Sequence, residues 1–165
     1  MLVCAAAAMV GAAAASLGWP GAGSERAAVS FVTDVEDPRR LVGVVDNVFV
    51  GRVDGVEDVH MPSGVPETLY RVTVTDNIKG HLEGGVTVNQ LGGMAPGARA
   101  PTLVEDDDLL VVGGEYLFAT RVGGDGAWHT LVPRYGDVRI TDDAARARLV
   151  EAFRRAATEA IPFER

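Results

Sequence analysis

The sequence predicts a mainly β domain in which five short strands close into a small, strongly coiled barrel. Between Asn47 and Gly93, three strand-like runs follow one another, and glycine marks the bends between them. Two further runs lie between Glu115 and Pro133, joined by a glycine-rich turn. Alternating hydrophobic and polar residues are typical of half-buried strands, and glycine permits the sharp bends that a small barrel needs.

Five segments carry this strand pattern. In the second one, Tyr70, Val72 and Val74 alternate with polar residues, which predicts one buried and one solvated face. Gly51 lies inside the first, where a barrel strand has to bend, and the glycines of 123–126 favour a hairpin turn between the last two. The expected strands are Asn47–Val53 with an extension to Val56, Thr68–Thr75, Val86–Leu91, Glu115–Val122 and Trp128–Pro133.

One helix is expected before the first strand and one after the last. Asp37 can cap the first helix and Pro38 suits its first position, so a short helix begins here, although Gly43 weakens it. The C-terminal helix is expected to start at Thr141 as its N-cap, with Asp142 and the next aspartate complementing the helix dipole. The face expected to pack on the barrel consists of Ala145, Leu149, Phe153, Ala156 and Ala160.

The N-terminal segment differs in composition from the rest of the chain. Residues 1–17 are rich in alanine and carry no charge, which is typical of a signal peptide or a short N-terminal anchor. Ala13 and Ala15 offer a small-residue cleavage pattern. Cys4 is the only cysteine and lies in this segment, so a processed chain would contain no disulfide.

These features divide the chain into three parts. Residues 1–23 are assigned to a signal peptide or N-terminal anchor, residues 24–36 to a linker, and residues 37–162 to a single domain, because the length and hydrophobic content suit one core. The expected location is secreted or in the cell envelope, either free or tethered by an uncleaved N-terminal segment. Stable membrane insertion of the mature domain is not expected.

The charge of the chain argues against nucleic acid as a partner. The net charge is -8 at pH 7, and Lys79 is the only lysine. Nucleic-acid affinity depends on Lys and Arg side chains that neutralise phosphates, and single-strand sites combine a basic groove with aromatic platforms. The negative charge of an acidic domain would repel the phosphates of nucleic acid and of anionic lipid.

Five strands with glycine bends and a terminal helix fit an OB-type barrel, closed or partly open. The runs V-F-V-G-R-V, Y-R-V-T-V-T-D-N-I-K-G and G-G-E-Y-L-F-A resemble the tissue-inhibitor-of-metalloproteinases and netrin-like domains over residues 46–160. Gly51, Lys79-Gly80 and Glu115–Phe118 are the most specific pieces. The resemblance implies an OB barrel with a flanking C-terminal helix, as in a class of exported bacterial proteins without an assigned activity.

The resemblance implies binding loops more than an inhibitory activity. The inhibitors use an N-terminal cysteine, clamped by disulfides, to bind the protease zinc, and a processed chain here would lack cysteine. The loops after the first and third strands correspond to Asp54–Glu67 and Gly92–Asp108, and long loops on a rigid barrel are common binding sites. We therefore expect a non-enzymatic module that binds an unknown protein, glycan or small ligand outside the cytoplasm. The candidate partner-binding residues are His60, Pro62, Gly93, Arg99 and Glu105.

A metal-dependent enzyme or sensor domain is the alternative interpretation. The acidic run 105–108 offers hard oxygen ligands for calcium, with Asp106 and Asp108 as candidate ligands, although a solvated acidic turn gives the same pattern. His60, His81 and His129 lack the spacing of a zinc site. No nucleophile motif is present, so neither catalytic residues nor a cofactor are expected. A structural accessory domain of the envelope is a third interpretation.

Overall fold

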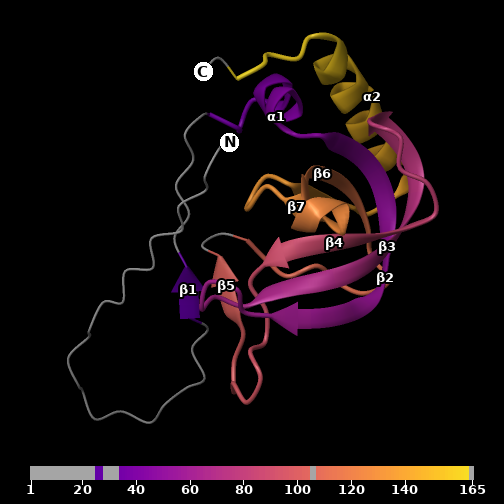
Figure 1. The fold of residues 1–165 in the computed structure, drawn as a ribbon. Helices are drawn as coiled ribbons and strands as arrows, with labels where there is room; N and C mark the ends of the chain where they lie inside the picture. Colours follow the sequence, from indigo (N-terminus) through magenta and orange to yellow (C-terminus); the bar gives the residue numbers. More distant parts are fainter. Residues whose placement is uncertain (1–24, 28–33, 105–106, 164–165) are drawn as a thin grey trace, which may run out of the picture.

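The computed structural model describes residues 25–27, 34–104 and 107–163. In this part of the chain the elements follow one another from a short N-terminal strand to a long C-terminal helix (Figure 1). They are β1 (Glu25–Ala27), α1 (Pro38–Val44), β2 (Asn47–His60), β3 (Glu67–Lys79), β4 (Gly85–Leu91), β5 (Thr102–Val104), β6 (Glu115–Gly123), the single 3-10 turn η1 (Gly124–Gly126), β7 (Trp128–Leu131), β8 (Asp137–Ile140) and α2 (Asp143–Thr158).

One sheet of six strands forms the body of the molecule. Its order is β2-β3-β4-β7-β6-β8, and β2 also pairs with β6, so five of the strands form a closed ring of pairings. The pairs are antiparallel except for β4 with β7, which run parallel. β8 lies along the edge of β6 beyond the part that β7 occupies. The predicted mainly β architecture, with a helix before β2 and another at the C-terminus, is confirmed.

The first two ring strands are longer and more strongly bent than predicted. β2 continues to His60 instead of ending near Val56, and its pairing with β3 contains four register shifts. One shift lies between Val50 and Gly51. A Cβ on Gly51 would lie 2.6 Å from Val72 Cγ1 and 3.0 Å from the Thr73 carbonyl oxygen. Gly51 is therefore required where the two strands approach each other most closely.

Two short strands and one helix cap differ from the sequence expectation. β5 lies inside the segment 92–108 that was predicted to be irregular, and β8 follows the last predicted strand. Short strands carry too few alternating residues to be recognised without their partners.

The N-cap of α2 is Asp142 instead of Thr141, because the Asp142 carboxylate accepts a hydrogen bond from the Ala145 amide at 2.7 Å. Ala160 is exposed beyond the end of α2.

The hydrophobic core has three clusters, one inside the ring, one between the sheet and both helices, and a small one where Val50 meets Ile140 and Val150. Inside the ring, Phe49 and Phe118 lie with their ring centroids 5.1 Å apart. Val48 and Leu117, the neighbours along each strand, face α1 and α2 on the other side of the sheet. Successive side chains of a strand point to opposite faces. Both faces of β2 and β6 are therefore buried, which explains the continuous hydrophobic run V-F-V at 48–50.

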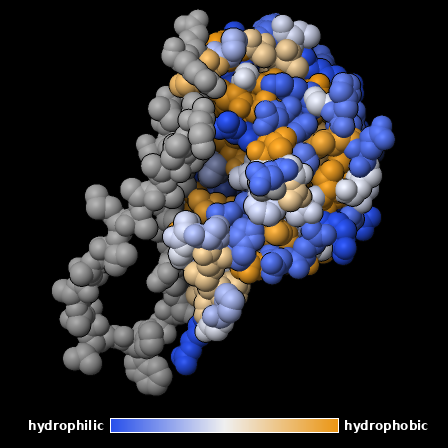
Figure 2. Space-filling view, viewed as in Figure 1, coloured by the Kyte–Doolittle hydropathy of each residue, from blue (hydrophilic) through white to orange (hydrophobic). Residues whose placement is uncertain are grey.

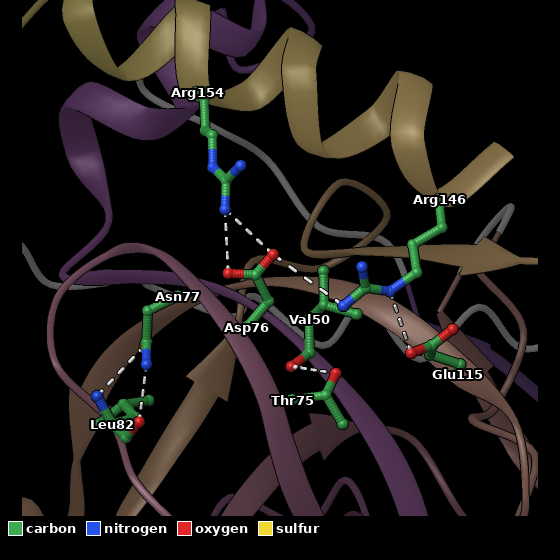
Figure 3. Close-up of polar contacts among 8 residues, drawn as sticks. All are labelled: Val50, Thr75, Asp76, Asn77, Leu82, Glu115, Arg146 and Arg154. Carbon is green, nitrogen blue, oxygen red and sulfur yellow. Dashed lines mark hydrogen bonds and ion pairs between the residues drawn. The ribbon is translucent and has the colours of Figure 1, made fainter. Parts of the chain in front are cut away.

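Ion pairs connect α2 to the sheet (Figure 3). Arg154 donates to the Asp76 carboxylate of β3 at 3.0 Å, and Arg146 donates to Glu115 of β6 at 3.4 Å. Pairs at the surface contribute little to stability on their own. The buried side chains of Val150, Phe153 and Ala156 on the same helix attach it through hydrophobic contacts with the core.

α1 is held at its C-terminal end and along one side. The Lys79 ammonium donates to the Val42 and Val45 carbonyl oxygens at 2.7 and 2.6 Å, so it caps the helix where carbonyls lack partners. The segment after α2 lies against α1, where the Ile161 amide donates to the Arg39 carbonyl at 3.0 Å. A Cβ on Gly43 would overlap the Ile161 carbonyl oxygen. Gly43 thus permits this close approach.

The helices that the structure describes include none whose length and hydrophobicity would suit a membrane span.

We expect Gly43→Ala to destabilise the fold by about 1–3 kcal/mol, because the added methyl group must displace the C-terminal segment. Helix propensity alone would predict the opposite, namely that Gly43→Ala raises the free energy of unfolding by about 1 kcal/mol. Gly85→Ala is the matched control, since a Cβ there meets no atom within 4 Å. Urea denaturation measures both free energies of unfolding, and a stabilised Gly43→Ala variant would contradict the close approach.

Candidate functional site

Strand register places a group of polar side chains on the outer face of the ring. Tyr70 of β3 points inward and pairs with Val88 of β4, so the neighbouring pair Leu69 and Asn89 points outward. Asn89 also pairs with Thr130 of β7. The outward row thus crosses β3, β4 and β7 and has a polar residue, Asn89, at its centre.

Four side chains meet around this position. The Asn89 amide nitrogen Nδ2 donates to Glu67 Oε2 at 2.6 Å, and His60 Nε2 lies 3.5 Å from the same oxygen. The His60 ring contacts the Trp128 ring with centroids 5.6 Å apart and planes tilted by 41°. We call His60, Glu67, Asn89 and Trp128 the Asn89 site. It joins the far end of the β2–β3 hairpin to the start of β7.

Asn89 carries a buried acceptor with no hydrogen bond. The residue is only 2% exposed, and its Oδ1 atom has no partner among the described residues. Reversing the amide would place Oδ1 against the Glu67 carboxylate, so the hydrogen bond from Nδ2 fixes the orientation. A buried polar atom without a partner costs about 1–3 kcal/mol. Such a cost is unusual in a native fold and requires a reason.

The Asn89 site carries negative charge without a permanent cation beside it. Within the described residues Glu67 has one ion-pair partner, His60, and both contacts of its carboxylate use Oε2. The Glu67 side chain is 20% exposed. Arg71 lies on the same face but pairs with Glu57 at 3.8 Å. The site therefore offers the partly exposed Glu67 carboxylate near an indole ring, whereas Asn89 Oδ1 is enclosed.

The candidate partner-binding residues predicted from the sequence lie in different parts of the structure. His60 is the last residue of β2 and belongs to the Asn89 site, and Pro62 is exposed in the turn 61–66. Gly93 is buried and exchanges two hydrogen bonds of 2.9 Å with Thr102. Arg99 is exposed, and Glu105 lies outside the described residues. The expected loop Asp54–Glu67 is thus mostly strand, and only 61–66 remains as a turn.

The second loop begins and ends against the ring. Gly92 donates its amide to the Pro66 carbonyl at 2.7 Å and accepts from Thr68 Oγ1 at 2.7 Å. The buried Gln90 side chain donates to the Asp108 carbonyl and accepts from the Leu110 amide. The turn 61–66 therefore ends, and the loop 92–101 begins, beside the start of β3, close to Glu67. Figure 1 shows the loop 92–101 extending below β5.

Of the acidic run 105–108, the structure describes Asp107 and Asp108, and Asp107 contacts the turn before β8. Asp106 lies outside the described residues, and Asp108 is exposed. Asp107 Oδ2 accepts from the Arg134 amide at 3.0 Å. Burial, together with the charges of Asp107 and Asp108, raises the pKa of Asp137 to about 7. Among the described residues no three Asp, Glu, His or Cys side chains are arranged to hold a metal ion.

The other two histidines lie apart from His60. His129 is half-buried on the inner side of β7, where its Nδ1 atom lies 3.4 Å from Asn47 Nδ2. Burial lowers the pKa of its imidazole. His81 is exposed in the turn after β3. Tyr70 and Phe118 are core residues.

Exposed hydrophobic residues are dispersed over the surface. On the face in Figure 2, hydrophobic residues lie in several separate places among hydrophilic ones. A broad apolar patch would indicate a protein-docking surface, and this face does not carry one. The exposed large hydrophobic residues in the described part of the chain are Val56, Met61, Met94, Val111, Val112, Val122 and Phe163.

Sequence reasoning missed three of the four residues of the Asn89 site. Glu67 stood at the end of a predicted loop, and Asn89 and Trp128 stood inside predicted strands. The signal that would have indicated Asn89 is its place on the outward row of V-T-V-N-Q-L beside a buried glutamine. That row is defined only when the register with β3 and β7 is known.

No family model matches the chain, and a search of curated proteins finds no match either. The geometry of the Asn89 site therefore carries the functional argument.

We expect the stability of the chain to fall as pH rises from about 4 to about 7, because Asp137 is protonated in the fold at pH values where the unfolded chain has lost that proton. Asp137→Asn should remove this slope and be more stable than the wild type at pH 8 by roughly 1–3 kcal/mol.

Urea denaturation at several pH values measures this effect. Asp58→Asn changes an exposed residue of β2, so its free energy of unfolding should depend on pH in the same way as that of the wild type. Parallel curves for Asp137→Asn and the wild type would show that burial does not hold the proton on Asp137.

Proposed function

We propose that the chain is an extracytoplasmic, non-enzymatic binding module that takes a small ligand at the Asn89 site. The observation that carries this proposal is the partly exposed Glu67 carboxylate, which Asn89 Nδ2 holds through a hydrogen bond of 2.6 Å and which has no lysine or arginine partner among the described residues. The Trp128 ring lies beside it through its contact with His60, so a hydrogen-bond acceptor and an apolar surface are close together. Asn89 Oδ1 is enclosed, and its missing hydrogen bond is a cost of holding Asn89 in this orientation. The alanine-rich N-terminal segment supports the proposed extracytoplasmic location.

The order of the five ring strands supports an OB-type barrel, which is the fold that the resemblance to the netrin-like and metalloproteinase-inhibitor domains implies. OB barrels bind ligands on the face of their second and third strands and on the loops between strands one and two and strands four and five. In chain order, the second and third ring strands are β3 and β4. The corresponding loops are the turns 61–66 and 124–127. Glu67, Asn89 and Trp128 belong to this face or border these turns.

The chemistry of the site supports binding over catalysis. Glu67 and Asn89 are hydrogen-bonding groups and Trp128 supplies an apolar surface, which is the usual composition of a small-molecule site. The described contacts of the site include no serine, threonine or cysteine nucleophile. The alternative metal-dependent enzyme or sensor has less support, because Asp108 is exposed and Asp107 accepts from the backbone of Arg134.

A ligand screen on the full chain tests the proposal. We expect members of a library of small polar compounds, containing sugars, amino acids, amines and carboxylates, to shift the NMR signals of the Asn89 side-chain amide and the Trp128 indole. Saturable shifts at these two groups would support the site. Ligands that shift only the loop 94–101, or a library without ligands, would overturn it.

Asn89→Leu separates a binding role from a structural one. We expect the substitution to abolish ligand binding while leaving the free energy of unfolding within about 1 kcal/mol of the wild type or above it, because the orphan acceptor is removed. Thr120→Val is the matched control, since Thr120 Oγ1 is the other buried atom without a partner in the described residues. This control should keep binding. A strongly destabilised Asn89→Leu variant with normal ligand binding would show that Asn89 is structural.

A further inference from the structure

We propose that residues 107–111 form a strap over one side of the ring interior, and that this strap opens when the Asp137 carboxyl loses its proton. The device lies outside the Asn89 site and does not depend on the proposed binding function. It rests on the hydrogen bonds that hold the strap, on the position of Asp137 next to it, and on the negative charges that the strap carries.

The strap is held by individual hydrogen bonds instead of strand pairing. Residues 107–111 belong to no helix or strand. The Gln90 side chain of β4 donates to the Asp108 carbonyl at 2.8 Å and accepts from the Leu110 amide at 2.9 Å. The Val111 amide donates to the Tyr116 hydroxyl of β6 at 3.0 Å. Segments outside the paired strands are the ones that open locally at low free energy.

Leu110 connects the strap to the interior of the ring. Its side chain is 5% exposed and belongs to the cluster that contains Tyr70 and Phe118. Its neighbour Val111 is exposed. Opening of the strap would therefore withdraw one apolar side chain and uncover the interior cluster.

Asp137 lies on the inner side of β8, beside the strap. It pairs with Phe118 of β6, which points into the ring, so the Asp137 side chain points the same way. β8 ends the strand order of the sheet, and among the described strands it pairs with β6 alone. The strap reaches the turn before β8, where Asp107 Oδ2 accepts from the Arg134 amide at 3.0 Å.

The groups around Asp137 oppose its ionisation. Burial, together with the charges of Asp107 and Asp108, raises the pKa of Asp137 to about 7. Tyr70 of β3 also faces it, and burial raises the pKa of this phenol to about 12, so Tyr70 stays neutral when Asp137 titrates. The Arg134 charge acts on Asp107, whose carboxyl it favours in the ionised form.

Arg139, on β8 itself, has an exposed side chain. An ionised Asp137 would add a further negative charge beside Asp107 and Asp108. Movement of the strap takes both of these charges away and admits water to Asp137. One motion thus relieves both causes that keep the proton on Asp137.

The direction of the effect follows from proton linkage. With the strap closed, Asp137 loses its proton near pH 7, whereas a hydrated carboxyl in the open form has a pKa close to its ordinary value of 3.8. The open form binds fewer protons in this range, so its population rises by about tenfold per pH unit between about pH 4 and pH 7. Above pH 7, Asp137 is ionised in both forms and the population levels off.

Hydrogen exchange of the full chain, followed by NMR between pH 5 and pH 8 at several low urea concentrations, tests the proposal. We expect the protection factors of the Leu110 and Val111 amides to fall about tenfold per pH unit up to pH 7 and then to level off. They should change little with urea, because a local opening exposes little surface. The Asp46 amide, which donates to the Thr120 carbonyl at 2.9 Å, is the reference for opening of the ring and should depend strongly on urea.

Three variants identify the group that titrates. Asp137→Asn cannot ionise, so the protection factors of Leu110 and Val111 should no longer depend on pH. Asp107→Asn keeps an acceptor for the Arg134 amide and removes one charge, so the levelling-off should move to lower pH. Asp58→Asn changes an exposed residue of β2 and should behave as the wild type.

Constant protection of Leu110 and Val111 from pH 5 to pH 7, or a pH dependence that survives Asp137→Asn, would overturn the proposal. The same urea dependence for these amides as for Asp46 would also overturn it, because Leu110 would then leave the ring only when the whole fold opens. If Asp137→Asn does not fold, Asp107→Asn decides, since an unchanged pH profile in that variant contradicts the role of the strap charges.

Discussion

The pairing of β2 with β6 is the interaction on which the other features depend. It joins the first ring strand to the fourth in chain order and turns a row of paired strands into a ring. Phe49 and Phe118 meet inside because this register aligns them, and Val48 and Ala119 are directed toward the helices by the same alignment. A one-residue slip of either strand would exchange the two faces of that strand. The interior core and the helix-facing core are thus specified together.

The long β2–β3 hairpin follows from that closure. Strand pairing with β6 ends at Arg52, and β2 continues to His60 paired with β3 among the described strands. Its register shifts bend the hairpin, and this brings His60 to the Trp128 ring of β7, two strands away from β3 in the sheet. The Asn89 site therefore depends on long-range geometry. Four residues that are distant in sequence meet because the ring is small and strongly curved.

The sequence predicted features that depend on local chemistry. The alternation at Tyr70, Val72 and Val74 and the cap and proline at α1 each act within a few residues, so the ring strands and both helices could be recognised. Asn89 could not be recognised, because its burial depends on residues from β2, β3 and β7. Gly43 was interpreted as a weakness of α1, since the approach of Ile161 arises only after the C-terminal helix has packed.

The cap of α1 by Lys79 has a consequence for covalent chemistry. Lys79 is the only lysine, and its amine is engaged by two backbone carbonyls in the folded chain. An amine that donates its protons to buried acceptors is a poor nucleophile, because acylation requires the free base and an open approach. Amine-directed reagents should therefore modify Lys79 slowly in the folded chain. Reaction at Lys79 would report opening of α1, so acylation kinetics at this one side chain can follow local unfolding at the C-terminal end of the helix.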